Sequence, residues 1–195
     1  MGFTDQYRTI ADLPETIPVF PLAGAILLPR GQLPLNIFEP RYLKPPLRAI
    51  GCAGRITSYA ETGDGRIVIT LTGISRFHLQ AELTAMTPYR QFKVDWEAFA
   101  DDLIEGHGQD AVSRERLLEI LKEYLDTHGL QADWRAIRAS SNEALVNSLC
   151  TISPYGPREK QALLEAKTLE DRNQMLIALT EQALHELAPG DVTVQ

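Results

Sequence analysis

Prolines and glycines divide the apolar stretch from Ile17 to Tyr42 into short runs, and this punctuation limits what the chain can fold into. The runs cover residues 17–22, 25–29 and 33–38, and each is rich in branched or aromatic side chains. Short runs of this kind, bounded by turn residues, indicate β-strands. Proline has no backbone N–H to donate, so we expect these strands at the ends, edges or bulges of a sheet.

The same stretch, IPVFPLAGAILLPRGQLPLNIFEPRY, resembles the opening of the Lon protease N-terminal, substrate-binding domain family. In that family a run of the form P-L-F-P-L-P-G, L-F-P and L-P-L-x-I-F-E-P-R-Y begins the domain. Ala23 stands where the family usually has proline, and Asn36 where it often has histidine. The runs GCAGRI at 51–56, GISRF at 73–77 and EKQALLE at 159–165 are similar to the same family, so the resemblance covers nearly the whole chain.

Period-two alternation continues from Gly51 to Glu97 and predicts further strands. The sequence TGDG at 62–65 predicts a hairpin turn, and Gly73 predicts a bulge or bend. After the turn, the alternation places two sets of side chains on common faces: Ile67, Ile69 and Leu71, and then, pointing inward, Phe77, Leu79, Ala81 and Leu83. A last strand is expected at 89–96, with three side chains together: Phe92, Val94 and Trp96.

Beyond residue 111 the apolar period changes to about 3.6 residues, which predicts helices. The signals that begin these helices are caps or a first-turn proline: Ser113, Asp133, Ser140 with Glu143 as a capping box, Pro157 and Thr168. Gly129 is expected to end the first helix, and the last is expected to reach about Leu187.

The predicted fold class is therefore α+β, with a small, mostly antiparallel β-barrel followed by a helical bundle. We expect the β part at 1–97, an acidic connector at 98–110 and the helical part at 111–190. The resemblance implies that the β part is PUA-like. Asp101 and Asp102 fall in the connector, where we interpret them as solvated.

Charge is unevenly distributed along the 195 residues, whose net charge is −7. There are 10 basic and 9 acidic residues through Glu97, against 9 and 17 beyond it. An acidic chain argues against nucleic acid or an anionic membrane as the main partner. No apolar run has the ~20 residues that span a bilayer, and no signal peptide pattern opens the chain, so we expect a cytoplasmic protein. Cys52 and Cys150 are expected to be buried free thiols, with a disulfide left open as the alternative.

The sequence holds no pattern typical of an active site. A phosphate-binding G-x-x-x-x-G-K-[ST] loop is absent, and no two histidines or cysteines have metal-ligand spacing, so no cofactor or metal is expected. Full Lon proteases carry ATPase and protease modules, which do not fit in these 195 residues. The resemblance thus implies a non-enzymatic module that recognises unfolded or degron-bearing polypeptides beside a protease or chaperone. The alternative is a PUA-like barrel that binds a small ligand or RNA.

The candidate peptide-binding residues belong to the proline-rich stretch: Phe20, Leu28, Phe38, Glu39, Arg41 and Tyr42. Apolar side chains would supply shallow pockets, and an extended peptide would add to a strand edge. For Glu39 and Arg41 a structural role, in which they pair or satisfy backbone groups, stays open. Only nine positions separate Tyr42 from Gly51, too few for the helix and strand that the family has there. Either that element is lost or a segment is missing near Lys44–Pro45.

Overall fold

The computed structural model describes residues 6–37, 46–87 and 89–187. By contacts the chain divides into two compact units, one of Met1–His107 with Pro154–Glu165 and the other of Gly108–Ser153 with Ala166–Gln195. The first unit is mostly strands and the second is helical, so the predicted α+β class is confirmed. The segment 154–165, which contains a helix at 157–165, is grouped with the strands, and this helix contacts the strand at 50–61.

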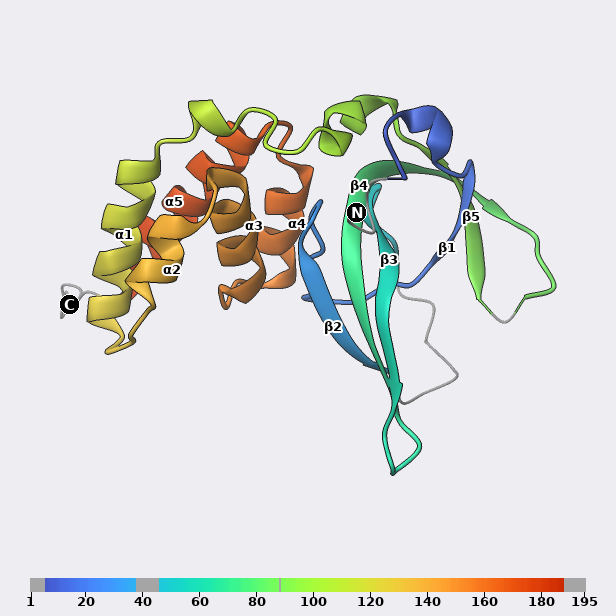
Figure 1. The fold of residues 1–195 in the computed structure, drawn as a ribbon, viewed down its shortest axis with the longest axis horizontal. Helices are drawn as coiled ribbons and strands as arrows, with labels where there is room; N and C mark the ends of the chain where they lie inside the picture. The colour runs from blue at the N-terminus through green and yellow to red at the C-terminus, as the bar shows by residue number, and fades with distance from the viewer. Residues whose placement is uncertain (1–5, 38–45, 88, 188–195) are drawn as a thin grey trace, which may run out of the picture. The chain divides into compact units, whose positions relative to one another are not determined.

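The first unit is built on one antiparallel sheet with a long central strand (Figure 1). Its strands are β1 (Thr16–Val19), β2 (Gln32–Ile37), β3 (Ile50–Glu61), β4 (Ile67–Leu83) and β5 (Arg90–Asp95). Along one edge β4 pairs with β3, and along the other it pairs first with β2 and then with β5, which in turn pairs with β1. The predicted turn at 62–65 joins β3 to β4, with Gly65 at φ 80° and a hydrogen bond of 2.9 Å from Gly65 N to Thr62 O.

Residues 25–29 do not form the predicted strand. Ile26, Leu27 and Leu28 are buried, but their segment meets β4 only around Gly73. Arg30 N donates to Gly73 O, and Gly73 N donates to Gly31 O, both at 2.9 Å. A Cβ on Gly73 would lie 2.0 Å from Leu28 O, so the glycine is required by this close approach of two backbones. The predicted bend is also there, because the β3–β4 register shifts between Ala53 and Gly54, leaving Ile74 as an extra residue on β4.

The core of the first unit lies where β4 and β5 meet. Its buried members are Leu13, Ile74, Phe77, Phe92, Val94 and Trp96. The predicted grouping of Phe92, Val94 and Trp96 is confirmed, and Phe77 packs edge-on to Trp96 with ring centroids 5.6 Å apart. The inward placement of Ala81 and Leu83 is wrong: both are exposed, because the β4–β5 register shifts between Leu79 and Ala81, which leaves Gln80 as an extra residue and turns the following side chains to the other face.

The first unit also contains two 3-10 segments and one helix. η1 (Ile10–Asp12) precedes the strands, and η2 (Glu97–Leu103) and α4 (Pro157–Glu165) follow them in the sequence. Pro157 opens α4 as predicted. η2 occupies much of the expected connector and packs on β4, while α4 contacts β3 through a hydrogen bond of 3.1 Å from Gln161 Nε2 to Ile50 O.

The second unit contains η3 (Gln109–Ala111), α1 (Arg114–Thr127), α2 (Trp134–Ala139), α3 (Asn142–Ile152) and α5 (Leu169–Leu187). α5 packs against α1 and α3. Asp133 caps α2 as predicted, and Thr168 begins α5 with a reciprocal pair of hydrogen bonds to Asp171. The capping box at Ser140 is wrong by one residue. Ser141 caps α3 through Ala144 N, while the Ser140 hydroxyl donates back to Ile137 O.

Candidate functional site

Only two of the six predicted peptide-binding residues, Phe20 and Leu28, lie within the described part of the chain. Phe20 follows β1 and is 40% exposed. Leu28 has 0% of its surface exposed, so its side chain does not offer a pocket to a ligand in this conformation. The other four, Phe38, Glu39, Arg41 and Tyr42, lie outside the described residues, as does the Lys44–Pro45 junction. Their binding role stays a prediction.

An apolar face forms elsewhere in the first unit, on the sheet in which β4 lies between β2 and β3. Residues paired directly across an antiparallel sheet share a face. The registers join Leu35 to Ile69 and Ile69 to Tyr59, and the next rung joins Leu33, Leu71 and Ile56. On the rung nearest the hairpin turn, Ile67 pairs with Ile37 on one side and with Glu61 on the other. We call the resulting set the open sheet face; its members are Leu33, Leu35, Ile37, Ile56, Tyr59, Ile67, Ile69 and Leu71.

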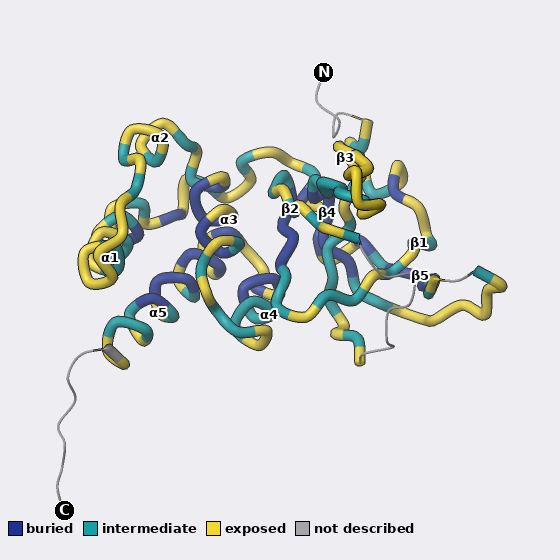
Figure 2. The backbone as a smooth tube through the Cα atoms, turned by 90° about the horizontal axis from the view of Figure 1, so that it is seen from below, coloured by how far each residue is buried: buried dark blue, intermediate teal, exposed yellow. Residues whose placement is uncertain are grey.

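None of the eight side chains is buried. Ile56 is 56% exposed and Tyr59 63% exposed, and the other six have intermediate exposure. No residue from Gly54 to Thr72 is buried, and the β3–β4 hairpin accordingly shows only teal and yellow in Figure 2. Eight large apolar side chains on one sheet face, none of them buried within the described part of the chain, are typical of a binding surface.

The opposite face of the same three strands is mixed in character. Its polar members include Gln32, Asn36, Ser58, Thr70 and Thr72, and its apolar members are the smaller Pro34, Ala60 and Val68. At one end of the open sheet face, Leu27 lies so near that a Cβ on Gly54 would come within 2.7 Å of it. The larger apolar side chains thus gather on the open sheet face, which makes it the side better suited to apolar partners.

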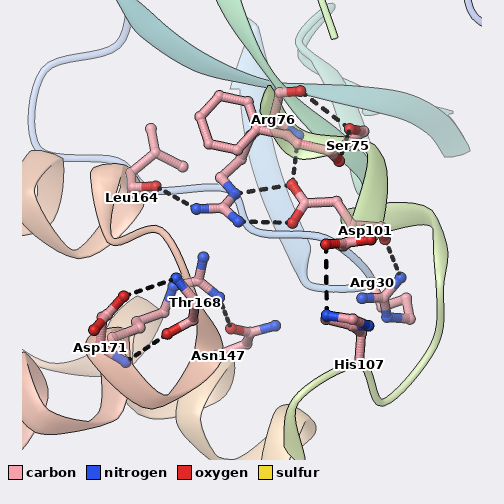
Figure 3. A network of polar contacts seen from close by, with 12 residues as sticks. Arg30, Ser75, Arg76, Asp101, His107, Asn147, Leu164, Thr168 and Asp171 are labelled. Carbon is pink, nitrogen blue, oxygen red and sulfur yellow. Dashed lines mark hydrogen bonds and ion pairs between the residues drawn. The ribbon is translucent and has the colours of Figure 1, made fainter. Parts of the chain in front are cut away.

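Beyond that end, β4 carries a buried ion pair that braces the first unit (Figure 3). Arg76 is 4% exposed and Asp102, in η2, is 8% exposed. Arg76 donates from Nε at 2.8 Å and from Nη2 at 2.7 Å to the two carboxylate oxygens, and its backbone N donates to the same group at 2.9 Å. Its Nη1 donates to Leu164 O in α4 at 3.2 Å.

Two further contacts close this cluster. The Arg76 guanidinium lies 4.4 Å from the centroid of the Phe99 ring, and Arg30 Nη1 donates to Asp102 O at 2.7 Å. Through the Arg76 guanidinium and the backbone carbonyl of Asp102, the pair therefore links β4, η2, α4 and the segment before β2. The interpretation of Asp102 as solvated is wrong, whereas its neighbour Asp101 is exposed and faces His107 at 3.5 Å. With its donors and acceptors engaged within the protein, the pair is suited to bracing the fold.

The ends of β1, β4 and β5 hold a second exposed apolar cluster. Leu83 is 40% exposed, Met86 107% and Tyr89 52%. Phe20 belongs here by register, because Val19 pairs with Arg90. The hairpin beneath is braced by two hydrogen bonds from Arg90 to Glu82, at 2.7 and 2.8 Å, which raise the pKa of the Arg90 guanidinium. This cluster is smaller than the open sheet face and comes mostly from a loop.

The described residues contain neither a candidate metal-binding cluster nor a candidate membrane-spanning helix. No three His, Cys, Asp or Glu side chains gather there as a metal-binding group, and both cysteines are free thiols, with Cys150 buried and Cys52 partly so. Across the same residues, no helix is both long and apolar enough to traverse a bilayer.

We compared the sequence with models of known protein families to identify the domain that contains this face. Residues 44–182 match the family model of the ATP-dependent protease La (LON) substrate-binding domain. The chain belongs to this family. The match spans more than half of the chain and confirms the family suggested by the proline-rich stretch, although it begins just after that stretch.

Solved structures agree with the assignment at the level of fold. A Lon N-terminal domain protein from Xanthomonas campestris is 22% identical, with a TM-score of 0.59, and the similarity covers 84% of this chain and 97% of that one. The N-terminal domain of the Mycobacterium avium complex Lon protease is 18% identical, with a TM-score of 0.61, over 85% of this chain and 98% of the other. A search of curated proteins returned no match.

The sequence alone did not predict two features of this Lon substrate-binding domain: the full extent of the open sheet face and the buried Arg76–Asp102 pair. Alternation predicted that Ile67, Ile69 and Leu71 share a face, but the partner residues on β2 and β3 depend on strand register. Asp102 and Asp101 are adjacent and chemically identical, and only the tertiary position of Arg76 separates a buried brace from a surface charge.

Proposed function

We propose that this Lon substrate-binding domain is a non-catalytic module that recognises unfolded polypeptides, and that the open sheet face receives their apolar side chains. The observation that carries the proposal is that none of the eight apolar residues of that face is buried, and that two of them, Ile56 and Tyr59, are more than half exposed. Family membership supports the class of ligand, because the family is that of a substrate-binding domain of a protease.

The size of the face sets the expected affinity. A patch of a few hundred Å² that loses its water contributes roughly 5–8 kcal/mol at about 25 cal/mol per Å². Association and the ordering of a flexible chain offset much of that gain. Binding in the micromolar range is the expected result, and it suits a domain that must accept many sequences and release them to a protease or chaperone.

Catalysis is not part of the proposal. The polar side chains with the strongest mutual contacts, Arg76 and Asp102, are held by each other, by Leu164 O and by the Phe99 ring. A nucleophile or general base would need a group free to meet a substrate. The module would therefore bind without turnover and without ATP.

The test is a titration of a fluorescently labelled, permanently unfolded protein with the purified chain, in the absence of ATP. The double variant Ile56→Ser/Tyr59→Ser removes the two most exposed members of the face. The matched control is Leu83→Ser/Tyr89→Ser, an aliphatic and a tyrosine of comparable exposure on the β4–β5 hairpin.

We expect the wild type and the control to bind with similar affinity and the face variant to bind at least tenfold more weakly, a loss of about 1.4 kcal/mol. Absence of wild-type binding at tens of micromolar would contradict the proposed function. Loss of binding in the control variant alone would place recognition on the hairpin cluster and contradict the proposed site.

A further inference from the structure

The strands that border the open sheet face have edges that resist pairing with another strand. β2 pairs only with β4 in the described parts of the chain, so its other edge is open. Pro34, opposite Thr70, occupies the middle of β2 and has no N–H to offer. A proline is tolerated in a paired strand when its nitrogen faces away from the partner, so the gap in the donors lies on the open edge.

The open edge of β3 is irregular for a different reason. Ile56 pairs with Leu71 and Ser58 with Thr70, so Thr57 is an extra, bulged residue. The Thr57 hydroxyl is tied back to β4, 3.3 Å from Thr70 O and 2.9 Å from the Thr72 hydroxyl. A bulge interrupts the regular spacing of donors and acceptors that an added strand would need, and it is a known protection of sheet edges.

The face between these edges is mostly apolar, with the charged Glu61 opposite Ile67 at its hairpin end. It runs from the Leu33–Leu71 rung to the Ile37–Ile67 rung, five residues of β2, which is about 13 Å along the strand. Three strands at about 4.8 Å spacing make it roughly 10 Å wide. Four or five residues of an extended chain fit this area. The turn next to it contributes no net charge, because Asp64 and Arg66 pair with each other at 2.9 Å.

We propose that the open sheet face binds short apolar segments of an unfolded polypeptide through their side chains alone, without adding the substrate backbone as a strand to β2 or β3. The inference rests on the proposed function and specifies how the ligand is held. Because no ladder of backbone hydrogen bonds forms, recognition does not depend on substrate N–H groups and tolerates proline within the bound segment.

Backbone-methylated peptides test this mode directly. The parent peptide has ten residues with alternating apolar side chains, and two derivatives carry N-methyl groups at the odd or at the even positions. Either derivative lacks the N–H groups along one edge, and together they cover both edges that could pair. Affinities for the wild type are measured by fluorescence anisotropy.

Side-chain recognition predicts that both derivatives bind within about threefold of the parent and that Ile56→Ser/Tyr59→Ser weakens all three peptides equally. A loss of tenfold or more for either derivative would overturn the inference while leaving the proposed function intact. If the parent peptide itself fails to bind, the proposed function and the inference both fail.

A protein variant provides the reciprocal measurement. Pro34→Ala restores an N–H on the open edge of β2, and Pro34 is exposed, so its side chain is not part of the core. Unchanged affinity for the parent peptide is expected, with folding checked by thermal unfolding. A gain of fivefold or more in affinity would show that an added strand uses this edge, and would overturn the inference.

Discussion

Replacing Asp102 with asparagine removes a charge that the first unit buries. The carboxylate accepts three N–H groups of Arg76 and is 8% exposed, so the substitution keeps the shape and leaves the guanidinium without its counter-charge. Losing one partner of a buried ion pair costs about 3–5 kcal/mol, because the remaining charge stays out of water. The Phe99 ring, 4.4 Å from the guanidinium, offsets only a small part of that loss.

The whole free energy of unfolding of a domain is about 5–15 kcal/mol, so Asp102→Asn is expected to remove a large share of it. Urea unfolding measures this loss. With a slope of about 2 kcal/mol per M, the midpoint should fall by roughly 1.5–2.5 M. The chain has two tryptophans, and in a Trp134→Phe background the fluorescence reports Trp96 alone, which is 6% exposed in the core of the first unit.

Asp101→Asn is the matched control. Its side chain is 69% exposed and lies 3.5 Å from the exposed His107 ring, so a change within about 0.5 kcal/mol is expected. If Asp102→Asn destabilises the protein by less than about 1 kcal/mol more than Asp101→Asn does, the account of the buried pair as a brace is refuted.

Two other substitutions test local features of the fold. Gly73→Ala would place a Cβ 2.0 Å from Leu28 O and should destabilise the first unit by more than about 2 kcal/mol in the same urea assay, whereas Gly63→Ala, with nothing within 4 Å, should be nearly neutral. Equal effects of the two would contradict the close approach. Ser141→Ala removes the cap of α3 and should lower stability by about 1 kcal/mol, measured by circular dichroism, and an unchanged melting temperature would argue that Ser141 is not the cap.

Local signals in the sequence predicted much of the fold because they act within a few residues. The caps at Asp133 and Thr168 and the hairpin at 62–65 each satisfy nearby backbone groups, so their chemistry is readable without tertiary information. Where two neighbours offer the same chemistry, the choice between them depends on packing, and Ser141 rather than Ser140 became the cap of α3.

The segment at 25–29 shows why an apolar run does not by itself predict a strand. It meets β4 at an isolated bridge from Pro29 to Gly73 rather than along a ladder, yet Leu28 is completely buried. A strand also needs a neighbouring strand to pair with, and this depends on the whole sheet. Residues 25–29 have no such ladder in the described structure, so they do not form a strand.

The open sheet face shows the same difference between what the local sequence pattern specifies, which is side-chain direction, and what tertiary packing specifies, which is burial. Alternation specifies which side chains of a strand point the same way, because successive residues of a strand face opposite sides. It does not specify whether another layer covers them: Phe77 and Ile69 obey one pattern on β4, but Phe77 is in the core and Ile69 is on the open face. The difference comes from the extra residue at Ile74, where β4 leaves the face and enters the core. This bulge thus allows one strand to contribute to the interior with one half and to the proposed binding face with the other.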